Sequence, residues 1–172
     1  MEATIDRAMG RADGRAARKE PTAWLDGGQR VALMRIGFGL IWAIDAWYKW
    51  RPAFLTGFGD EISRPLQSAP APLQPWLLFW QNLLSPHAML FAVATALLET
   101  LIAVCLILGL ARRPIYVVGA AFSFLIWAVP ESFGRIWQTG QTDIGTSIIY
   151  VFIFLALLVV DTGANAGGWS LD

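Results

Sequence analysis

Four long runs of apolar residues dominate the hydropathy pattern of the chain. They extend over about residues 31–50, 88–110, 114–129 and 144–160. A helix that crosses a lipid bilayer needs roughly 20 mostly apolar residues, so the first two runs are long enough and the last two are short. The pattern predicts an all-α integral membrane protein, built as a bundle of four transmembrane helices.

These runs divide the chain into three parts. Residues 1–30 form a polar tail, which we expect to be cytoplasmic and partly disordered because charges of both signs and glycines alternate in it. Residues 31–161 form the predicted membrane domain. Residues 162–172 form a short C-terminal tail, also expected to be cytoplasmic.

The segment between the first two runs, about residues 51–87, is long and rich in proline. Within it, residues 75–84 form an apolar stretch that is too short to span a bilayer. Trp76 and Trp80 in this stretch suit the headgroup boundary of a membrane. We therefore predict an extra interfacial helix in the first outer loop. The alternative is that this stretch plugs the outer mouth of the bundle.

Residues that favour helix ends support these limits. Pro114 lies where a helix tolerates proline, in its first turn, and Pro130 is expected to bend or end the third span. Thr142 and Asp143 are expected to cap the fourth span, because their side-chain oxygens accept hydrogen bonds from free N–H groups. Gly163 suits its end.

Basic residues predict the orientation, because short cytoplasmic loops are enriched in lysine and arginine. The N-terminal tail is basic, and the loop after the second run carries Arg112 and Arg113. The opposite loops mix basic with acidic residues. Both termini are therefore expected in the cytoplasm.

The composition agrees with a lipid environment and excludes several kinds of site. Of the 172 residues, 56% are hydrophobic and 15% are charged, against about 45–50% and about 25% in soluble domains. A net charge of zero argues against nucleic-acid binding. His87 and Cys105 are the only histidine and cysteine. One chain therefore cannot supply a bis-histidine haem or a Cys-rich metal site, and no metal site is assigned.

Four ionisable residues fall inside predicted spans, where each costs roughly 2.5–3.5 kcal/mol on insertion scales. Arg35, Asp45 and Lys49 share one face of the first span at about 100° per residue. Two interpretations stay open: the cations extend to the interfaces while Asp45 neutralises Lys49, or the face is a polar site. Glu99 lies near the middle of the second span. It is protonated, paired with a basic group of another helix, or part of a polar path.

Three short motifs follow one another along the chain. The first is R-x3-G-x9-K in the first span, and the second is a glutamate followed by L-x-x-G-L-x-x-R in the second. The third is the Gly- and Asp-containing loop before the fourth span. Their residues are Arg35, Gly39 and Lys49; Glu99, Leu106, Gly109, Leu110 and Arg113; and Glu131, Gly134 and Asp143 within residues 130–150. Together they resemble the DoxX/DoxD family of small four-helix membrane proteins.

The resemblance implies a function as well as a fold. The DoxD subunit of thiosulfate:quinone oxidoreductase suggests a small multi-pass subunit of a redox complex in a bacterial or archaeal inner membrane. It would work near the quinone pool and be linked to thiosulfate or thiol oxidation. Its partners would be membrane lipid, other redox subunits and a second copy of the chain. The expected cofactor is a quinone, with none held permanently within the chain.

The resemblance also suggests roles for particular residues. If the chain itself carries the thiosulfate or quinone chemistry, Arg35, Lys49 and Arg112 would supply positive charge for an anion or a quinone carbonyl, and Glu99 a proton. Arg112 and Arg113 are the candidates for binding an anion on the cytoplasmic side. Many family members carry His-Gly where this chain has Asp45-Ala46. No residue is assigned as catalytic. The alternatives are a non-enzymatic assembly subunit of a respiratory complex and a conduit for protons or small solutes.

Overall fold

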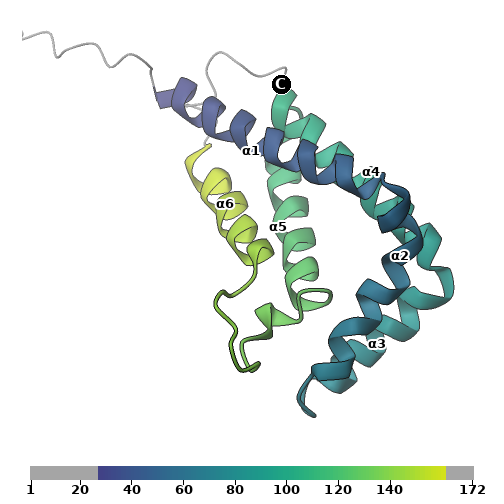
Figure 1. Cartoon of the computed structure of the whole chain (residues 1–172). Coiled ribbons are helices and arrows are strands. Elements are labelled where there is room, and N and C mark those ends of the chain that lie inside the picture. The colour runs from purple at the N-terminus through teal and green to yellow at the C-terminus, as the bar shows by residue number, and fades with distance from the viewer. Residues whose placement is uncertain (1–26, 162–172) are drawn as a thin grey trace, which may run out of the picture.

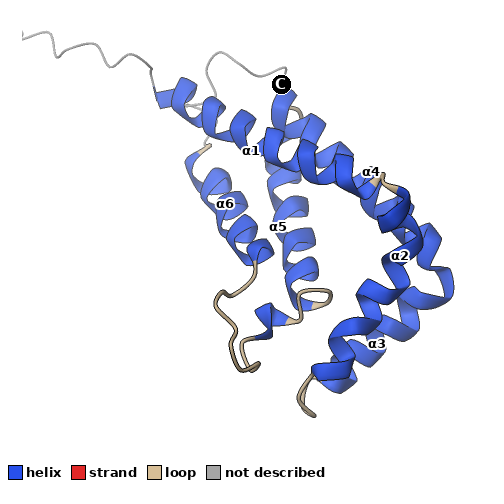
Figure 2. Cartoon of the chain, in the orientation of Figure 1, coloured by secondary structure: helices blue, strands red, loops and turns tan. Residues whose placement is uncertain are grey.

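The computed structural model describes residues 27–161, and every regular element in this range is helical (Figure 2). No strand occurs between these residues, so the all-α prediction is confirmed. The α-helices of this part of the chain are α1 Gly27–Lys49, α2 Pro52–Ser63, α3 Gln74–Leu84, α4 Ala88–Leu108, α5 Arg112–Ala128 and α6 Thr146–Val160. Short 3-10 helices are η1 Arg64–Ser68, η2 Ser85–His87 and η3 Phe133–Arg135.

Two helical stretches are long and apolar enough, by length and composition, to cross a membrane. They are α1, in which an 18-residue window has a mean hydropathy of 1.3, and the run Gln74–Leu108, in which such a window has a mean hydropathy of 2.4. The second run joins α3, η2 and α4 into one stretch of 35 residues. Helix α6 is a shorter apolar helix. The helices α1, α4, α5 and α6 lie within a few residues of the four predicted spans.

The long helices associate in pairs (Figure 1). Helix α1 lies along α4, and α5 lies along α6. Helices α4 and α5 meet at the turn that joins them and then diverge, so that the two pairs spread apart away from this turn. Helices α2 and α3 form a hairpin that continues from α1 and packs on the start of α4. This hairpin lies on the side where the two pairs are furthest apart.

A glycine in each pair permits the close approach of the helices. A Cβ atom at Gly39 would lie 2.9 Å from both Cβ of Leu106 and Cγ1 of Ile107. In the second pair, a Cβ atom at Gly119 would overlap the ring of Phe154. Small residues at helix crossings are typical of helices that pack closely in membranes. The glycine of the first motif therefore has a packing role.

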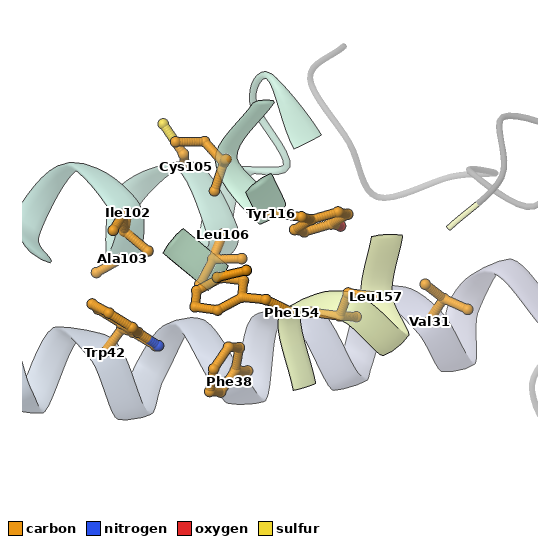
Figure 3. Packing of buried hydrophobic residues seen from close by; sticks show 12 residues of the cluster. Val31, Phe38, Trp42, Ile102, Ala103, Cys105, Leu106, Tyr116, Phe154 and Leu157 are labelled. Atoms are coloured by element: carbon orange, nitrogen blue, oxygen red, sulfur yellow. The ribbon is translucent and has the colours of Figure 1, made fainter. Parts of the chain in front are cut away.

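Aromatic rings fill the space between α1, α4 and α6 (Figure 3). The ring centroids of Phe38 and Phe154 are 4.8 Å apart, and those of Trp42 and Phe154 are 5.5 Å apart. Edge-on and tilted contacts of this kind stabilise aromatic pairs beyond the area that they bury. Cys105 lies in the same cluster and is buried, as expected for a small core thiol.

Two predicted boundaries need correction. Helix α1 begins at Gly27, so residues 27–30 belong to the first helix and not to the N-terminal tail. Helix α2 lies in the proline-rich segment, where only one helix was predicted. Pro52 occupies the first turn of α2, where the missing N–H group costs nothing. The predicted disorder of the tail and the expected end at Gly163 concern residues 1–26 and 162–172, which lie outside the described range.

Candidate functional site

A pocket of about 250 Å³ opens where α4 and α5 diverge. Its walls come from α2, α3, α4 and α5, and most of the side chains that line it are apolar. Three ionisable side chains interrupt this lining: Lys49, Glu61 and Glu99. The apolar walls are formed by Phe54, Phe58, Ile62, Trp80, Leu84, Phe91, Phe122, Leu125, Ile126, Val129 and Pro130.

Helical periodicity explains how each wall is built. Phe54, Phe58 and Ile62 recur every four residues on α2, so they lie on one face of this short helix. Trp80 and Leu84 are related in the same way on α3. The α2–α3 hairpin therefore turns an aromatic face toward the divergent ends of α4 and α5.

The hairpin is also attached to the far end of α5. The indole N–H of Trp76 donates a hydrogen bond of 3.0 Å to the backbone oxygen of Ala128. Leu78, Phe79 and Leu83 on the opposite side of α3 are exposed. Residues 75–84 thus form the predicted helix. One of its faces lines the pocket, and the side chains of the other face are exposed.

Lys49 and Glu99 form the polar end of the pocket. Nζ of Lys49 lies 4.0 Å from Oε1 of Glu99. The carboxylate is 2% exposed, whereas the lysine side chain is 28% exposed and also lies over the ring of Phe54. Oε2 of Glu99 is buried and has no hydrogen-bond partner among residues 27–161. Of the three interpretations of Glu99, the structure agrees with pairing to a basic group of another helix, which is Lys49 of α1.

Asp45 faces a different helix. The hydroxyl of Tyr150 on α6 donates a hydrogen bond of 3.3 Å to Oδ2 of Asp45. Within the described range the ion pair of Lys49 is with Glu99, and this arrangement does not support the interpretation in which Asp45 neutralises Lys49. The reason is that the carboxylate of Glu99 is the more deeply buried of the two, and a buried charge gains more from a counter-ion.

Arg35 lies at the opposite end of the α1–α4 pair. It is 2% exposed, and its guanidinium donates hydrogen bonds to the backbone oxygens of Leu106 and Ile107. These carbonyls belong to the last turn of α4, where a cation interacts favourably with the helix dipole. Arg35 therefore joins α1 to the end of α4 and lies far from the pocket, instead of extending to a surface.

Arg112 and Arg113 have different surroundings. Nη1 of Arg112 lies 2.9 Å from Oδ1 of Asp161, and the hydroxyl of Tyr116 donates a hydrogen bond of 2.6 Å to Oδ2 of the same carboxylate. This buried cluster ties the start of α5 to the end of α6 and compensates the charge of Arg112. Arg113 is exposed, so of the two predicted anion-binding arginines only Arg113 presents its charge to solvent.

The loop before α6 is built around Glu131. Its carboxylate accepts hydrogen bonds from the backbone N–H of Ser147, at 3.3 Å, and from the hydroxyl of the same serine, at 2.6 Å. Because Ser147 lies in the first turn of α6, Glu131 caps this helix across the loop. Asp143 accepts a hydrogen bond from the backbone N–H of Gly145 and shapes the turn before the helix. The predicted capping by Thr142 and Asp143 is therefore wrong.

Gly134 has a conformation and a contact that only glycine tolerates. Its φ is +69°, and a Cβ atom would collide with the backbone carbonyl of Ile144. The indole N–H of Trp127 donates a hydrogen bond of 2.7 Å to the same carbonyl oxygen. Glu131, Gly134 and Asp143 thus hold the loop in place, and none of the three lines the pocket.

The predicted polar residues therefore separate into three groups. Lys49 and Glu99 come together at the pocket, Asp45 contacts α6, and Arg35 and Arg112 stabilise the other end of the bundle. The sequence interpretation missed the aromatic wall from α2 and the carboxylate of Asp161. The four-residue spacing of Phe54, Phe58 and Ile62 was a signal for the first. An acidic residue directly after an apolar run was a signal for the second.

Comparison with known proteins identified no relative of this chain. No family model, curated protein or solved structure matches the chain. The resemblance to the DoxX/DoxD family therefore rests on the three sequence motifs alone.

Proposed function

We propose that the protein is a four-span subunit of a membrane redox complex and that its pocket holds the ring of a lipid-soluble quinone. The observation that carries this proposal is the aromatic-lined pocket that ends at the Lys49–Glu99 pair. The resemblance to the DoxX/DoxD family points in the same direction. The complex would couple the quinone pool to oxidation of thiosulfate or thiols by a partner subunit.

Exposed apolar side chains on the four long helices support a four-span topology. Large apolar residues stand exposed on α1, α4, α5 and α6, for example Leu40, Ile44, Leu97, Leu101, Val117, Phe124, Phe152 and Val159. Contiguous apolar surface on this scale is rare on soluble monomers, and lipid would cover it. Helices α5 and α6 have 17 and 15 residues, short for a hydrocarbon core of about 30 Å. A bilayer adapts to short helices by local thinning.

The positive-inside rule orients the proposed bundle. The α4–α5 turn, with Arg112 and Arg113, would face the cytoplasm together with both termini. The Arg112–Asp161 cluster would then lie near the cytoplasmic surface. The pocket and the α2–α3 hairpin would lie in the outer half of an inner membrane.

The chemistry of the pocket suits a quinone ring. Phe54, Phe58 and Phe122 line the pocket with aromatic rings, which favour a planar aromatic ligand, and Lys49 offers a cation to an oxygen on the ring. The volume of about 250 Å³ is slightly below the range of about 300–1,000 Å³ that is usual for drug-sized ligands. The pocket therefore suits a head group, whose apolar tail would extend into lipid.

A photoreactive quinone tests the proposal in membranes. An azidoquinone should label peptides that line the pocket in the wild-type chain. Phe122→Trp, which adds bulk to the pocket wall, should reduce this labelling several-fold. Leu40→Trp is the matched control, because Leu40 is exposed on α1 and outside the pocket. Equal labelling of all three proteins, spread over the lipid-facing helices, would overturn the proposed site.

Purification in mild detergent tests the proposed subunit role separately. We expect an oxidoreductase partner and quinone to copurify with the chain. Recovery of the chain alone, at every detergent concentration that keeps it folded, would contradict membership of a redox complex.

A further inference from the structure

We propose that the pocket prefers the reduced, hydroxyl-bearing form of its ring ligand, and that Glu99 accepts the hydrogen bond from a ring hydroxyl. This inference rests on the proposed function, because it assumes that a ring-shaped ligand occupies the pocket. It adds the chemical class of that ligand, an aromatic diol, and the orientation in which it binds.

The first observation is an acceptor that the protein leaves unused. Only 2% of the surface of Glu99 is exposed, and its Oε2 has no hydrogen-bond partner among residues 27–161. Lys49 lies nearest to the other oxygen, Oε1, at 4.0 Å, which is too long for a hydrogen bond. Buried carboxylate oxygens are normally satisfied. A donor that enters the pocket would satisfy this one.

The second observation is a donor on the facing wall. The Nε1 atom of Trp80 is also buried without a hydrogen-bond partner in the described part of the chain, and Trp80 lines the same pocket. It comes from α3, whereas Glu99 comes from α4. Among the fully buried polar atoms of the pocket lining, one acceptor and one donor, on different helices, are thus unused.

A ring with two hydroxyl groups matches both. One hydroxyl donates to Oε2 of Glu99, and an oxygen of the ring accepts from the indole N–H of Trp80. The oxidised quinone has carbonyl acceptors only, so it can accept from Trp80 or Lys49, but it has no hydroxyl to donate to Oε2 of Glu99. The unused acceptor therefore favours the reduced form, and the unused donor serves both forms.

The walls distinguish an aromatic diol from other membrane-soluble alcohols. Phe54, Phe58, Phe91 and Phe122 line the same pocket as Glu99 and Trp80. Stacking on these rings stabilises a planar ligand, whereas a glycerol backbone or an alkyl alcohol gains little from it. A long-chain alcohol can satisfy Glu99, so it serves as the competing ligand in the test.

Equilibrium binding to the full chain in nanodiscs tests the inference. The ligands are decylhydroquinone under reducing conditions, its dimethyl ether, decylquinone and 1-decanol. A hydrogen bond to a charged group is worth about tenfold or more in affinity. We therefore expect decylhydroquinone to bind about tenfold more tightly than its dimethyl ether, and more tightly than decylquinone and 1-decanol.

Two substitutions assign the preference to particular atoms. Glu99→Gln has nearly the same volume, and its amide can donate to a carbonyl, so the preference should shift toward decylquinone. Trp80→Phe should weaken the binding of both ring forms without reversing their order. Asp60→Asn is the control, since Asp60 is an exposed acidic residue of α2 outside the pocket.

The outcomes separate this inference from the proposed function. Equal affinity for decylhydroquinone, its ether and decylquinone would overturn the inference and leave the ring-binding pocket standing. Tighter binding of 1-decanol than of either ring form would also overturn it, in favour of a lipid alcohol. Binding of no ring ligand at all would overturn the proposed function together with the inference.

Discussion

Lys49 and Glu99 connect the end of α1 to the middle of α4, with Nζ and Oε1 4.0 Å apart at the polar end of the pocket. The carboxylate is buried and the lysine is partly exposed, so the two partners depend on the pair unequally. Removal of the lysine leaves a buried charge without compensation, whereas removal of the glutamate leaves a cation that can turn toward solvent.

The first prediction is therefore an asymmetric effect on stability. Lys49→Met should lower the free energy of unfolding by about 1–2 kcal/mol, less than the about 3–5 kcal/mol of a fully buried broken pair, because water partly screens Lys49. Glu99→Leu should cost less, since it removes the buried charge. Denaturant unfolding in detergent micelles measures both.

The double variant tests whether the two residues act on each other. Lys49→Met combined with Glu99→Leu should be more stable than Lys49→Met alone, because the double variant no longer buries the uncompensated carboxylate of Glu99. Strictly additive losses in the double variant would contradict a direct interaction.

Much of this architecture follows from the sequence, because the long helices coincide with long runs of apolar residues. The four apolar runs correspond to α1, α4, α5 and α6. Helix α2 was not predicted because it has only 12 residues. Its stability depends on the packing of Phe58 and Ile62 against Ala92 of α4 and Val129. The formation of this helix therefore depends more on tertiary packing than on its own composition.

The contacts between side chains were harder to predict than the helices. Glu131 caps a helix that begins 15 residues later, whereas a helix cap is normally sought among the residues just before the first turn. Two carboxylates, those of Asp45 and Glu99, were candidate partners of Lys49. Only the packing of α1 on α4 determines that Glu99 is the partner. The sequence marked the ionisable residues as unusual, but their partners depend on the arrangement of the helices.

Two glycines of α1 provide a matched pair for the second prediction. Gly39→Ala should destabilise the protein by about 1–3 kcal/mol, because its Cβ atom would press on Leu106 and Ile107 in the α1–α4 contact. Gly37→Ala has no atom within 4 Å of the new Cβ and should be neutral or stabilise the helix by up to about 1 kcal/mol. Thermal unfolding followed by circular dichroism compares them. A greater loss at Gly37 would contradict the described helix contact.

The third prediction concerns the cap that Glu131 provides to α6. Glu131→Ala should reduce stability by about 1 kcal/mol, the usual effect of losing an N-terminal cap, and should increase hydrogen exchange in the first turn of α6. Ser147→Ala should have a smaller effect, because the backbone N–H of residue 147 can still donate to Glu131. Asp60→Asn serves as the control for loss of an exposed carboxylate. Unchanged exchange in Glu131→Ala would show that the cap does not hold this turn.

The fourth prediction tests the cluster at the α5–α6 end. Tyr116→Phe removes one hydrogen bond to Asp161 but keeps the ion pair with Arg112, so it should cost about 1–3 kcal/mol. Asp161→Leu removes both the ion pair with Arg112 and the hydrogen bond from Tyr116, so it should cost more. Val117→Ala, at an exposed apolar position on the same helix, controls for changes to α5 itself. An equal effect of all three substitutions on denaturant unfolding would contradict the cluster.

The last prediction concerns the membrane topology. The background variant Cys105→Ala removes the only thiol of the chain. In this background, Arg113→Cys places one exposed thiol in the first turn of α5, and Thr139→Cys places one in the loop before α6. The proposed orientation puts residue 113 in the cytoplasm and residue 139 outside, because an odd number of crossings separates them. A membrane-impermeant maleimide should therefore label Thr139→Cys in intact cells and Arg113→Cys only after permeabilisation. Labelling of both thiols in intact cells would contradict a membrane crossing by α5, and the reverse pattern would invert the orientation while leaving the crossing in place.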